Sequence, residues 1–271
     1  IKADKAYLNS DITIKNYNAS AKKDIVVLQQ VINKDNKQVA SKSIKYQLKS
    51  LDSLVLSNRD IIVKDPILSV ENPYLYKIVT RVMIGNKKVD ELVTDFGFRT
   101  INWKTPSHQF FLNGKPVFIN GVAEYEHLIG KSHAFSHEQV LSRVKWMQAA
   151  GFNAFRDGHQ PHNLLYGKQF NEKGILWWTQ LSAHVWYDTP EFKNNFKQLL
   201  KEWVIERRND PSVVLWGLQN ESKIPKAFAE ECTELIRSLD PTSKDLRLVT
   251  TCNGGEGTDW DVPQNWTGTY G

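Results

Sequence analysis

One stretch decides the fold of this sequence: VVLWGLQNES at residues 213–222. Its first four residues are apolar and follow Asp210-Pro211, which predicts a short buried strand after a turn. The strand ends in an amide and a carboxylate, Asn220 and Glu221. Parallel α/β barrels carry their chemistry at the carboxyl ends of their strands, so Glu221 is a candidate general acid or base, and Asn220 could bind a substrate hydroxyl. The alternative is that Asn-Glu-Ser simply caps the next helix.

Residues 99–271 alternate between strand-like and helical periodicity. We predict a hairpin at 110–119 that continues as a strand to Gly121, followed by strands at 152–156, 175–179, 213–219, 246–252 and 266–270. The helices predicted between them run from Ser136 to Gly151, over 162–173 up to Gly174, from Thr189-Pro190, and from the end of the 213–219 strand to Asp240-Pro241. This order is typical of a parallel α/β unit.

The predicted sheet has six strands, whereas a (β/α)8 TIM barrel needs eight. An open doubly wound sheet would accommodate six strands, but no glycine-rich phosphate fingerprint follows the first of them. The sequence ends at Gly271, directly after a predicted apolar strand, where no complete barrel would end. We therefore expect an incomplete barrel that belongs to a longer chain.

Residues 1–98 show a period of two instead. Strand-like runs occur near residues 11–17, 24–32, 43–49, 61–63, 75–84 and 89–94, with turns at 34–37 and at Gly85-Asn86. Six or seven short strands in about a hundred residues predict an antiparallel β-sandwich of immunoglobulin type. No constellation of catalytic residues occurs there, so we expect a structural domain at 1–98 before the barrel domain at 99–271.

Composition supports this division and excludes some functions. Residues 1–98 carry 16 Lys and Arg against 11 Asp and Glu, which accounts for the whole net charge of +5. All nine tryptophans and all seven histidines lie after residue 98. Because no dense basic run with interleaved aromatics occurs, we expect no nucleic-acid partner. Cys232 and Cys252 have neither metal-site nor disulfide spacing, and we expect both to be core thiols.

Membrane insertion is not expected, because no run approaches the ~18 apolar residues of a spanning helix. The sequence begins at Ile1 inside a strand-like pattern, which suggests a trimmed start. We therefore slightly favour a periplasmic or secreted protein over a cytoplasmic one.

Several motifs resemble glycoside hydrolase family 2, which contains β-galactosidases, β-glucuronidases and β-mannosidases. The matching motifs are FGFR at 96–99, FLNGKP at 111–116 with Gly121-Val122, NAFR at 153–156 with His159 and Pro161, and NDPSV at 209–213 through Trp216 to Asn220-Glu221. They resemble the junction and first barrel strand, the second strand and the fourth strand of that family. The match is collinear from about residue 70 to the end.

The resemblance implies a retaining β-glycosidase that hydrolyses terminal β-linked sugars of oligo- or polysaccharides without a cofactor. Glu221 would act as general acid and then general base, and Asn220 would bind the 2-hydroxyl of the sugar. A second carboxylate about 5–5.5 Å away is the nucleophile in retaining enzymes. In this family it lies on the seventh barrel strand, which would follow residue 271. We therefore expect residues 1–271 alone to be inactive.

The sequence departs from the family pattern at two strand ends. Tyr125 replaces a histidine that normally contacts the sugar. Thr179-Gln180 ends the third strand, where an acidic residue is common, and the acidic-x-His magnesium signature of some galactosidases is missing. We therefore expect no metal. The carboxylates of Glu256, Asp259 and Asp261, in a glycine-rich loop, do not match the nucleophile motif.

The remaining candidates each have a structural alternative. Arg156 is expected to orient catalytic carboxylates, or else to form a surface ion pair. His159 is either a ligand contact or a loop histidine, and Trp186 is either a sugar platform or lid packing. His127, His133 and His184 do not form a convincing metal set and are expected to be structural.

A different class of function fits the same fold: a noncatalytic carbohydrate-binding or scaffold protein. The altered Tyr125 and the missing nucleophile permit it, and a glutamate on the seventh strand would argue against it. An adhesion-type module centred on residues 1–98 would rest on analogy of fold alone. The sequence leaves open the sugar, the linkage and a homo-oligomer of the full-length protein.

Overall fold

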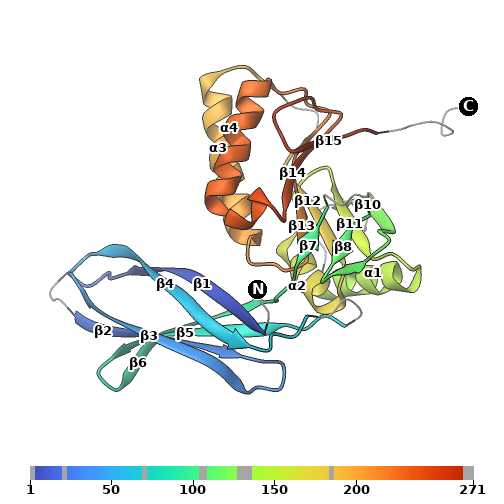
Figure 1. Cartoon of the computed structure of the whole chain (residues 1–271). Coiled ribbons are helices and arrows are strands. Elements are labelled where there is room, and N and C mark those ends of the chain that lie inside the picture. The colour runs from blue at the N-terminus through green and yellow to red at the C-terminus, as the bar shows by residue number, and fades with distance from the viewer. Residues whose placement is uncertain are drawn as a thin grey trace, which may run out of the picture. The chain divides into compact units, whose positions relative to one another are not determined.

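The computed structural model describes residues 4–19, 23–68, 72–103, 109–126, 136–182 and 186–264 (Figure 1). The chain forms two compact units, one of residues 1–69 and 74–98, the other of residues 70–73 and 99–271. The first unit is built of antiparallel strands, and the second alternates parallel strands with helices. Both agree with the structural classes that the sequence predicts.

The first unit contains two antiparallel sheets. A two-stranded sheet pairs β1 (Lys5–Lys15) with β4 (Ser53–Lys64), and a four-stranded sheet has the order β3 (Gln38–Leu48), β2 (Lys23–Ile32), β5 (Tyr76–Ile84) and β6 (Lys87–Phe96). The predicted two-residue turn between β5 and β6 is present, and Gly85 adopts a φ of 57°, as such hairpin turns require.

Alternation along β2 shows how the sandwich core forms. Ile25, Val27 and Val31 point inward and are buried. Gln29 lies on the same face and accepts hydrogen bonds of 2.8 Å from Ser10 and Asn58, which belong to the other sheet. Most of these strands are longer than predicted, notably β4, whereas β5 is one residue shorter than the predicted strand at 75–84. Lysines and serines on the exposed faces of these strands break up the apolar pattern from which their ends were predicted.

The second unit begins with three two-residue strands, β7 (Ile101–Asn102), β8 (Phe111–Leu112) and β9 (Lys115–Pro116). A parallel sheet follows in chain order: β10 (Gly121–Tyr125), β11 (Ala154–Gly158), β12 (Leu176–Gln180), β13 (Val213–Asn220), β14 (Leu248–Cys252) and β15 (Trp260–Val262). The connecting helices are α1 (His137–Ala149), α2 (Leu164–Lys173), α3 (Pro190–Arg207) and α4 (Lys226–Leu239), with a 3-10 turn at Pro241–Lys244.

Local signals set the helix ends. Ser136 and Gln139 form the predicted capping box of α1, with bonds of 3.3 and 2.7 Å. Gly174 ends α2 in the left-handed conformation, with a φ of 74°. Thr189 caps α3, and Pro190 occupies its first turn, where a missing N–H costs nothing.

Strand β13 runs through the centre of the core, and all eight of its residues are buried. Trp216 and Leu218 pack on the helical side with residues such as Trp203 of α3. Val214 and Leu215 belong to a second cluster, which also includes Ile101, Phe110 and Leu112 of the small hairpins. Burial on both sides explains why this strand reads as an unbroken apolar run.

Two strands differ from the sequence prediction. The first parallel strand begins at Gly121 rather than ending there, because β10 is made of small and polar residues without an apolar run. The sixth strand is β15, inside the loop that carries Asp259 and Asp261, and the predicted strand at 266–270 lies outside the described residues.

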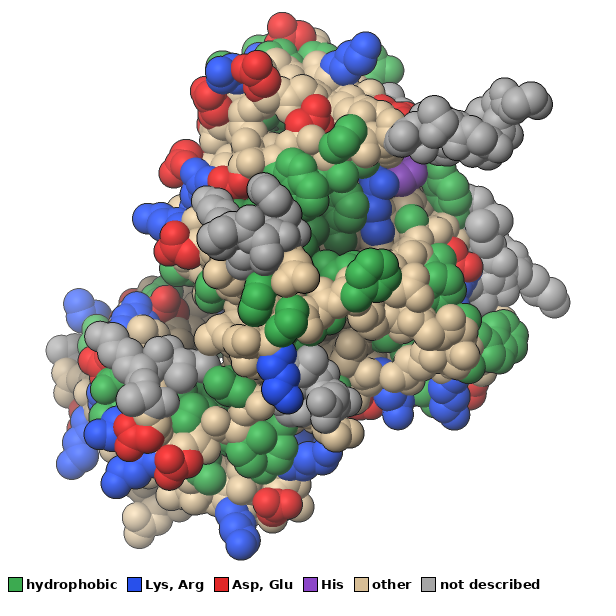
Figure 2. Space-filling view, turned by 45° about the vertical axis from the view of Figure 1, so that its right-hand side comes forward, with side chains coloured by type: hydrophobic (Ala, Val, Ile, Leu, Met, Phe, Trp, Pro, Cys, Tyr) green, Lys and Arg blue, Asp and Glu red, His purple; other side chains and the backbone are tan. Residues whose placement is uncertain are grey.

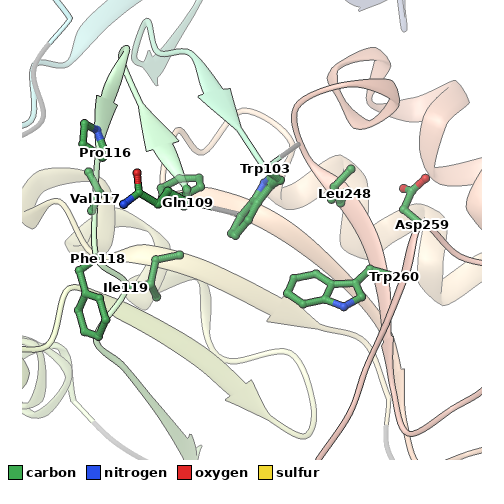
Figure 3. A pocket seen from close by; sticks show the side chains of 10 residues that line it. Trp103, Gln109, Pro116, Val117, Phe118, Ile119, Leu248, Asp259 and Trp260 are labelled. Carbon is green, nitrogen blue, oxygen red and sulfur yellow. The ribbon is translucent and has the colours of Figure 1, made fainter. Parts of the chain in front are cut away.

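The inner face of the α/β unit is open and apolar. A hollow of about 800 Å³ is lined mainly by hydrophobic side chains (Figure 3), including those of Trp103, Ile119, Leu248 and Trp260. The centroids of the Trp103 and Trp260 rings lie 6.4 Å apart on one side of it (Figure 3). Figure 2 shows hydrophobic side chains gathered around a hollow with basic and histidine side chains near one margin. None of the described helices is long and apolar enough to cross a membrane.

Candidate active site

The carboxyl ends of β10 to β14 bring together side chains that lie far apart in the sequence. Tyr125 ends β10, Arg156 lies in β11, Gln180 ends β12, Asn220 ends β13 and Cys252 ends β14. Asn220, Gln180 and Cys252 are each at most 1% exposed, whereas Tyr125 is 44% exposed. These side chains therefore form a largely buried polar cluster, called the Arg156 cluster below, at the edge of the sheet where parallel α/β folds carry their sites.

Arg156 lies at the centre of this cluster. Its Nη2 donates to Asn220 Oδ1 at 2.6 Å, and its Nε donates to Gln180 Oε1 at 3.2 Å. The guanidinium lies 4.4 Å from the centroid of the Trp178 ring, a cation–π distance. Burial lowers the pKa of Arg156, although Cys252 and Glu221 counteract it. Its bonded partners among the described residues are neutral, so the cation is held in place without a direct ion pair.

The Trp178 side chain is held by a hydrogen bond to a neighbouring strand. Its Nε1 donates to Thr250 Oγ1 at 2.9 Å, which joins β12 to β14 across β13. The indole crosses β13 at Gly217, where a Cβ atom would lie only 2.9 Å from Nε1. A glycine is thus required beneath the indole, and the indole supports the guanidinium of Arg156.

His159 joins the cluster from the loop after β11. Its Nδ1 lies 3.2 Å from Gln180 Oε1 and 3.4 Å from Arg156 Nη2, and its ring meets Tyr125 edge-on at 5.4 Å. The Gln180 amide donates to Ser182 O at 3.2 Å, so its oxygen faces Arg156 and His159. An amide oxygen only accepts, so a bond to Gln180 requires the hydrogen on Nδ1, and Arg156 Nη2, itself a donor, is then in contact with Nδ1 without a hydrogen bond.

Glu221 follows β13 in a strained turn. Its φ is 56°, a left-handed conformation that costs a non-glycine residue about 1–2 kcal/mol. The Glu221 N–H donates to Cys252 O at 2.9 Å, and the Asn220 N–H donates to Ser182 O at 3.0 Å. The side chain is half-buried. These bonds tie the turn to the ends of its two neighbouring strands.

The helix-capping alternative for this turn is wrong. Helix α4 begins only at Lys226, and Pro225 occupies its N-cap position without a side-chain cap bond. Residues 220–222 therefore end the strand but do not start the helix.

Trp186 is placed apart from the Arg156 cluster. Its ring packs 5.4 Å from Phe192 of α3 and 5.3 Å from Phe228 of α4, and Lys193 Nζ lies 5.8 Å from it. These are the contacts expected of the packing alternative.

The three carboxylates after β14 are engaged in other contacts. Glu256 pairs with Lys226 at 2.9 Å, and Asp259 pairs with Arg237 at 2.5 Å. Asp261 accepts from Thr251 Oγ1 at 2.8 Å and from the Gly254 N–H at 3.0 Å. They organise the loop.

The sequence analysis did not predict four members of the Arg156 cluster as site residues. Gln180 was noted only as a departure from the family, Cys252 was expected to be a core thiol, and Trp178 and Gln264 were not considered. Gln264 Nε2 donates to Asn220 Oδ1 at 2.5 Å. Burial raises the pKa of Cys252, although the adjacent Arg156 opposes this. Only the shared position at strand ends could have pointed to Gln180 and Cys252.

Both cysteines are free and buried, as predicted. Cys232 is fully buried on α4, and burial raises its pKa to about 12. His127, His133 and His184 lie outside the described residues. Within the described ranges, no group of three or more His, Cys, Asp or Glu side chains is arranged to hold a metal ion.

Asp157 supports the cluster from the helical side. Fully buried, it accepts from Trp177 Nε1 at 2.8 Å, Thr179 Oγ1 at 2.9 Å and the Gln180 N–H at 3.1 Å, and it lies 3.1 Å from His162 Nδ1. Burial alone would lower the pKa of His162, but Asp157 outweighs it and raises the pKa. Asp157 thereby fixes the end of β12 that presents Gln180.

Comparison with known proteins places both units in one family. Residues 1–99 match the sequence model of glycosyl hydrolases family 2, and residues 104–263 match the TIM barrel domain of that family. The fold class predicted from the sequence, an immunoglobulin-like sandwich followed by an incomplete TIM barrel, is thereby confirmed.

Individual relatives agree. A putative beta-glucuronidase of Formosa agariphila is 32% identical over 207 residues, which cover 74% of this chain and 19% of that protein. The beta-glucuronidase of Bacteroides fragilis is 25% identical, covering 90% of this chain and 37% of that protein. The crystal structure of Parabacteroides merdae beta-glucuronidase has a TM-score of 0.83 at 24% identity, covering 99% of this chain and 35% of that one.

The chain therefore spans between about a fifth and two fifths of the length of these relatives. The barrel model covers more than half of the chain, and its matched range includes the whole Arg156 cluster apart from Gln264. This chain belongs to glycosyl hydrolases family 2.

Proposed function

We propose that the protein containing these residues is a retaining β-glycosidase, with Glu221 as its general acid and then its general base. The observation that carries the proposal is the position of Glu221 directly after Asn220 at the end of β13, where Asn220 is bonded to Arg156 at 2.6 Å. The names of the relatives, beta-glucuronidase and beta-galactosidase, support cleavage of β-linked sugars.

In the first step, protonated Glu221 gives its proton to the glycosidic oxygen. A second carboxylate forms a bond to C1 while the C1–O bond breaks, and the electron pair of that bond stays on the leaving oxygen. In the second step, Glu221 takes a proton from water. The water oxygen bonds to C1, and the second carboxylate leaves. Glu256, Asp259 and Asp261 are committed elsewhere, and the resemblance to glycoside hydrolase family 2 implies that the nucleophile is a glutamate on the seventh barrel strand, after residue 271.

The Arg156 cluster would hold the sugar and both carboxylates in place. Asn220 Oδ1 already accepts from Arg156 and Gln264, so a sugar 2-hydroxyl would accept from Nδ2. Arg156, whose bonded partners are the neutral amides of Gln180 and Asn220, would orient the second carboxylate. Tyr125 and His159 would contact the sugar from the ends of β10 and β11. Trp186 keeps both of its alternatives, a sugar platform or lid packing, and its contacts with Phe192 and Phe228 favour packing.

The test is hydrolysis of aryl β-glycosides, including a β-glucuronide and a β-galactoside, by the full-length protein and its Glu221→Gln variant. We expect turnover of one sugar and a loss in kcat of at least about 100-fold in the variant. Added azide should partly restore turnover, since azide attacks C1 without help from a base. Residues 1–271 alone should hydrolyse none of these substrates.

Glu256→Gln is the matched control, because Glu256 is exposed and pairs only with the surface residue Lys226. It should keep wild-type kcat. An unchanged kcat in Glu221→Gln would remove Glu221 from the mechanism. A full-length protein that binds sugars but cleaves neither aryl glycosides nor polysaccharides would instead support the carbohydrate-binding alternative.

A further inference from the structure

The turn that carries Glu221 is held by a side chain. Gln219, the residue before Asn220, is 1% exposed, and its Oε1 accepts the Ser222 N–H at 2.6 Å. This bond closes a loop around Asn220 and Glu221. Glu221 and Lys223 both have left-handed backbones, with φ of 56° and 49°. Such a conformation in non-glycine residues persists only where surrounding contacts enforce it.

A glycine in the next loop makes room for this side chain. A Cβ atom built on Gly254 would lie 1.3 Å from Gln219 Nε2, so any other residue at 254 must displace Gln219. Gly254 is itself fixed, because its N–H donates to Asp261 Oδ1 at 3.0 Å. The loop after β14 thus forms a wall against which Gln219 is pressed.

Gln219 is a poor choice for stability alone. Its Nε2 has no hydrogen-bond partner among the residues that the structure describes. A buried amide with an unbonded donor costs folding free energy that an apolar side chain of the same length would not. The bond from Oε1 to Ser222 is what this glutamine adds.

We infer that Gln219 is a positioning residue for Glu221: it holds the 220–222 turn in the conformation that aims the Glu221 carboxyl group at the reacting oxygen. The inference rests on the proposed role of Glu221. Proton transfer requires heavy atoms within hydrogen-bond reach, so a relaxed turn would slow both steps that use Glu221 and leave the binding of the sugar by other residues intact.

Gln219→Met in the full-length protein is the primary test, because it keeps length and bulk and removes the acceptor. We expect kcat to fall on the order of tenfold with KM within about twofold, since the variant loses positioning and not the acid itself. Azide should raise the turnover of this variant and not that of the wild type. The melting temperature should not fall by more than about 3 °C.

Gln169→Met is the matched control, since Gln169 is also a buried glutamine, 3% exposed, but lies on α2 away from the strand ends. It should show neither the loss of kcat nor the response to azide. A Gln219→Met enzyme with wild-type kcat and no azide response overturns the inference, provided that Glu221→Gln behaves as proposed. If Glu221→Gln keeps its activity, the proposed function fails instead.

Gly254→Ala provides a second route that leaves Gln219 chemically intact. Its Cβ should displace Gln219 and lower kcat as Gln219→Met does. In a Gln219→Ala background the space is vacant, so adding Gly254→Ala should cause no further loss. Additive losses in the double variant would mean that the two residues act separately and would also overturn the inference.

Discussion

The two ends of the parallel sheet each bury an arginine, and they treat it in opposite ways. At the amino end, Arg247 is 4% exposed and pairs with Asp240 at 3.0 Å, and it also donates to the main-chain oxygens of Val213, Arg208 and Asp210 at 2.6–3.0 Å. At the carboxyl end, Arg156 meets two neutral amides, a histidine and the face of an indole. Arg247 is paired with a carboxylate, whereas Arg156 is bonded only to neutral groups among the described residues.

The two arginines differ in whether their charge is balanced by a carboxylate within the described part of the chain. Arg247 ties the start of β13 to the turn after α4, so its bonds are complete without any ligand. Arg156 has its geometry fixed by Gln180, Asn220 and Trp178, but its charge has no carboxylate bonded to it among the described residues. Parallel α/β proteins commonly place stability at one end of the strands and function at the other.

The largest effect is expected from Arg247→Met. It leaves Asp240 buried without its cation and removes a donor from three main-chain oxygens, of which Val213 O keeps Arg99 and Asp210 O keeps the Val213 N–H, so the α/β unit should lose about 3–5 kcal/mol of stability. Urea unfolding of the full-length protein, followed by tryptophan fluorescence, measures this loss. Lys197→Met is the control, because Lys197 forms a surface pair with Glu231 at 2.5 Å and should cost less than about 1 kcal/mol. Equal losses would remove the distinction between the two arginines.

Arg156→Met should show the reverse pattern. We expect kcat/KM to fall about 100-fold, because Asn220 and the second carboxylate lose their common donor. Stability should change by about 1 kcal/mol or less, because the lost bonds are to neutral amides. Arg156→Lys should not restore activity, since an ammonium cannot reach both Asn220 and Gln180 with the fork of a guanidinium. A stability loss as large as that of Arg247→Met would contradict this assignment.

A smaller effect on stability is expected from the pair of Asp157, near the carboxyl end of β11, and His162, in the loop that follows. The pKa of His162 is raised above its ordinary value of 6.5 in the folded protein, so the folded state holds this proton more tightly than the unfolded state. The resulting stability is complete below pH 6.5 and is lost as the pH rises through the raised pKa. Melting temperatures across this window should decline, and Asp157→Asn should flatten the decline. An equal decline in that variant would assign it to other groups.

Local patterns in the sequence predicted the helices and the central strand well. The capping box at Ser136, the terminating Gly174 and the Thr189-Pro190 start act within a few residues of the ends that they set, so they are readable without tertiary information. The buried run of β13 was equally clear. The first and last strands of the described sheet, β10 and β15, were misplaced, because their small and polar residues carry little periodic signal.

The residues of the candidate site also differ in whether the sequence alone could predict them. Glu221, Asn220, Arg156 and His159 were predicted as site residues because they lie in motifs that resemble those of a known family, and their roles stay predictions. Gln180, Cys252 and Gln264 were not predicted as site residues, because their relation to Arg156 depends on which strands are neighbours and in what register. Gln219 was passed over as one more residue of an apolar strand, although its amide closes the turn that carries Glu221.

The sequence by itself determined the two-unit organisation, the alternation of strands and helices, and the strand end at which a carboxylate follows an amide. These depend on periodicity and on contacts between near neighbours in the chain. Only the tertiary structure decided that Arg156 is held by Asn220, Gln180 and Trp178 while Arg247 is neutralised by Asp240. Side chains about 20 to 65 positions apart in sequence come within hydrogen-bonding distance only when parallel strands align their ends, and no local pattern encodes that alignment.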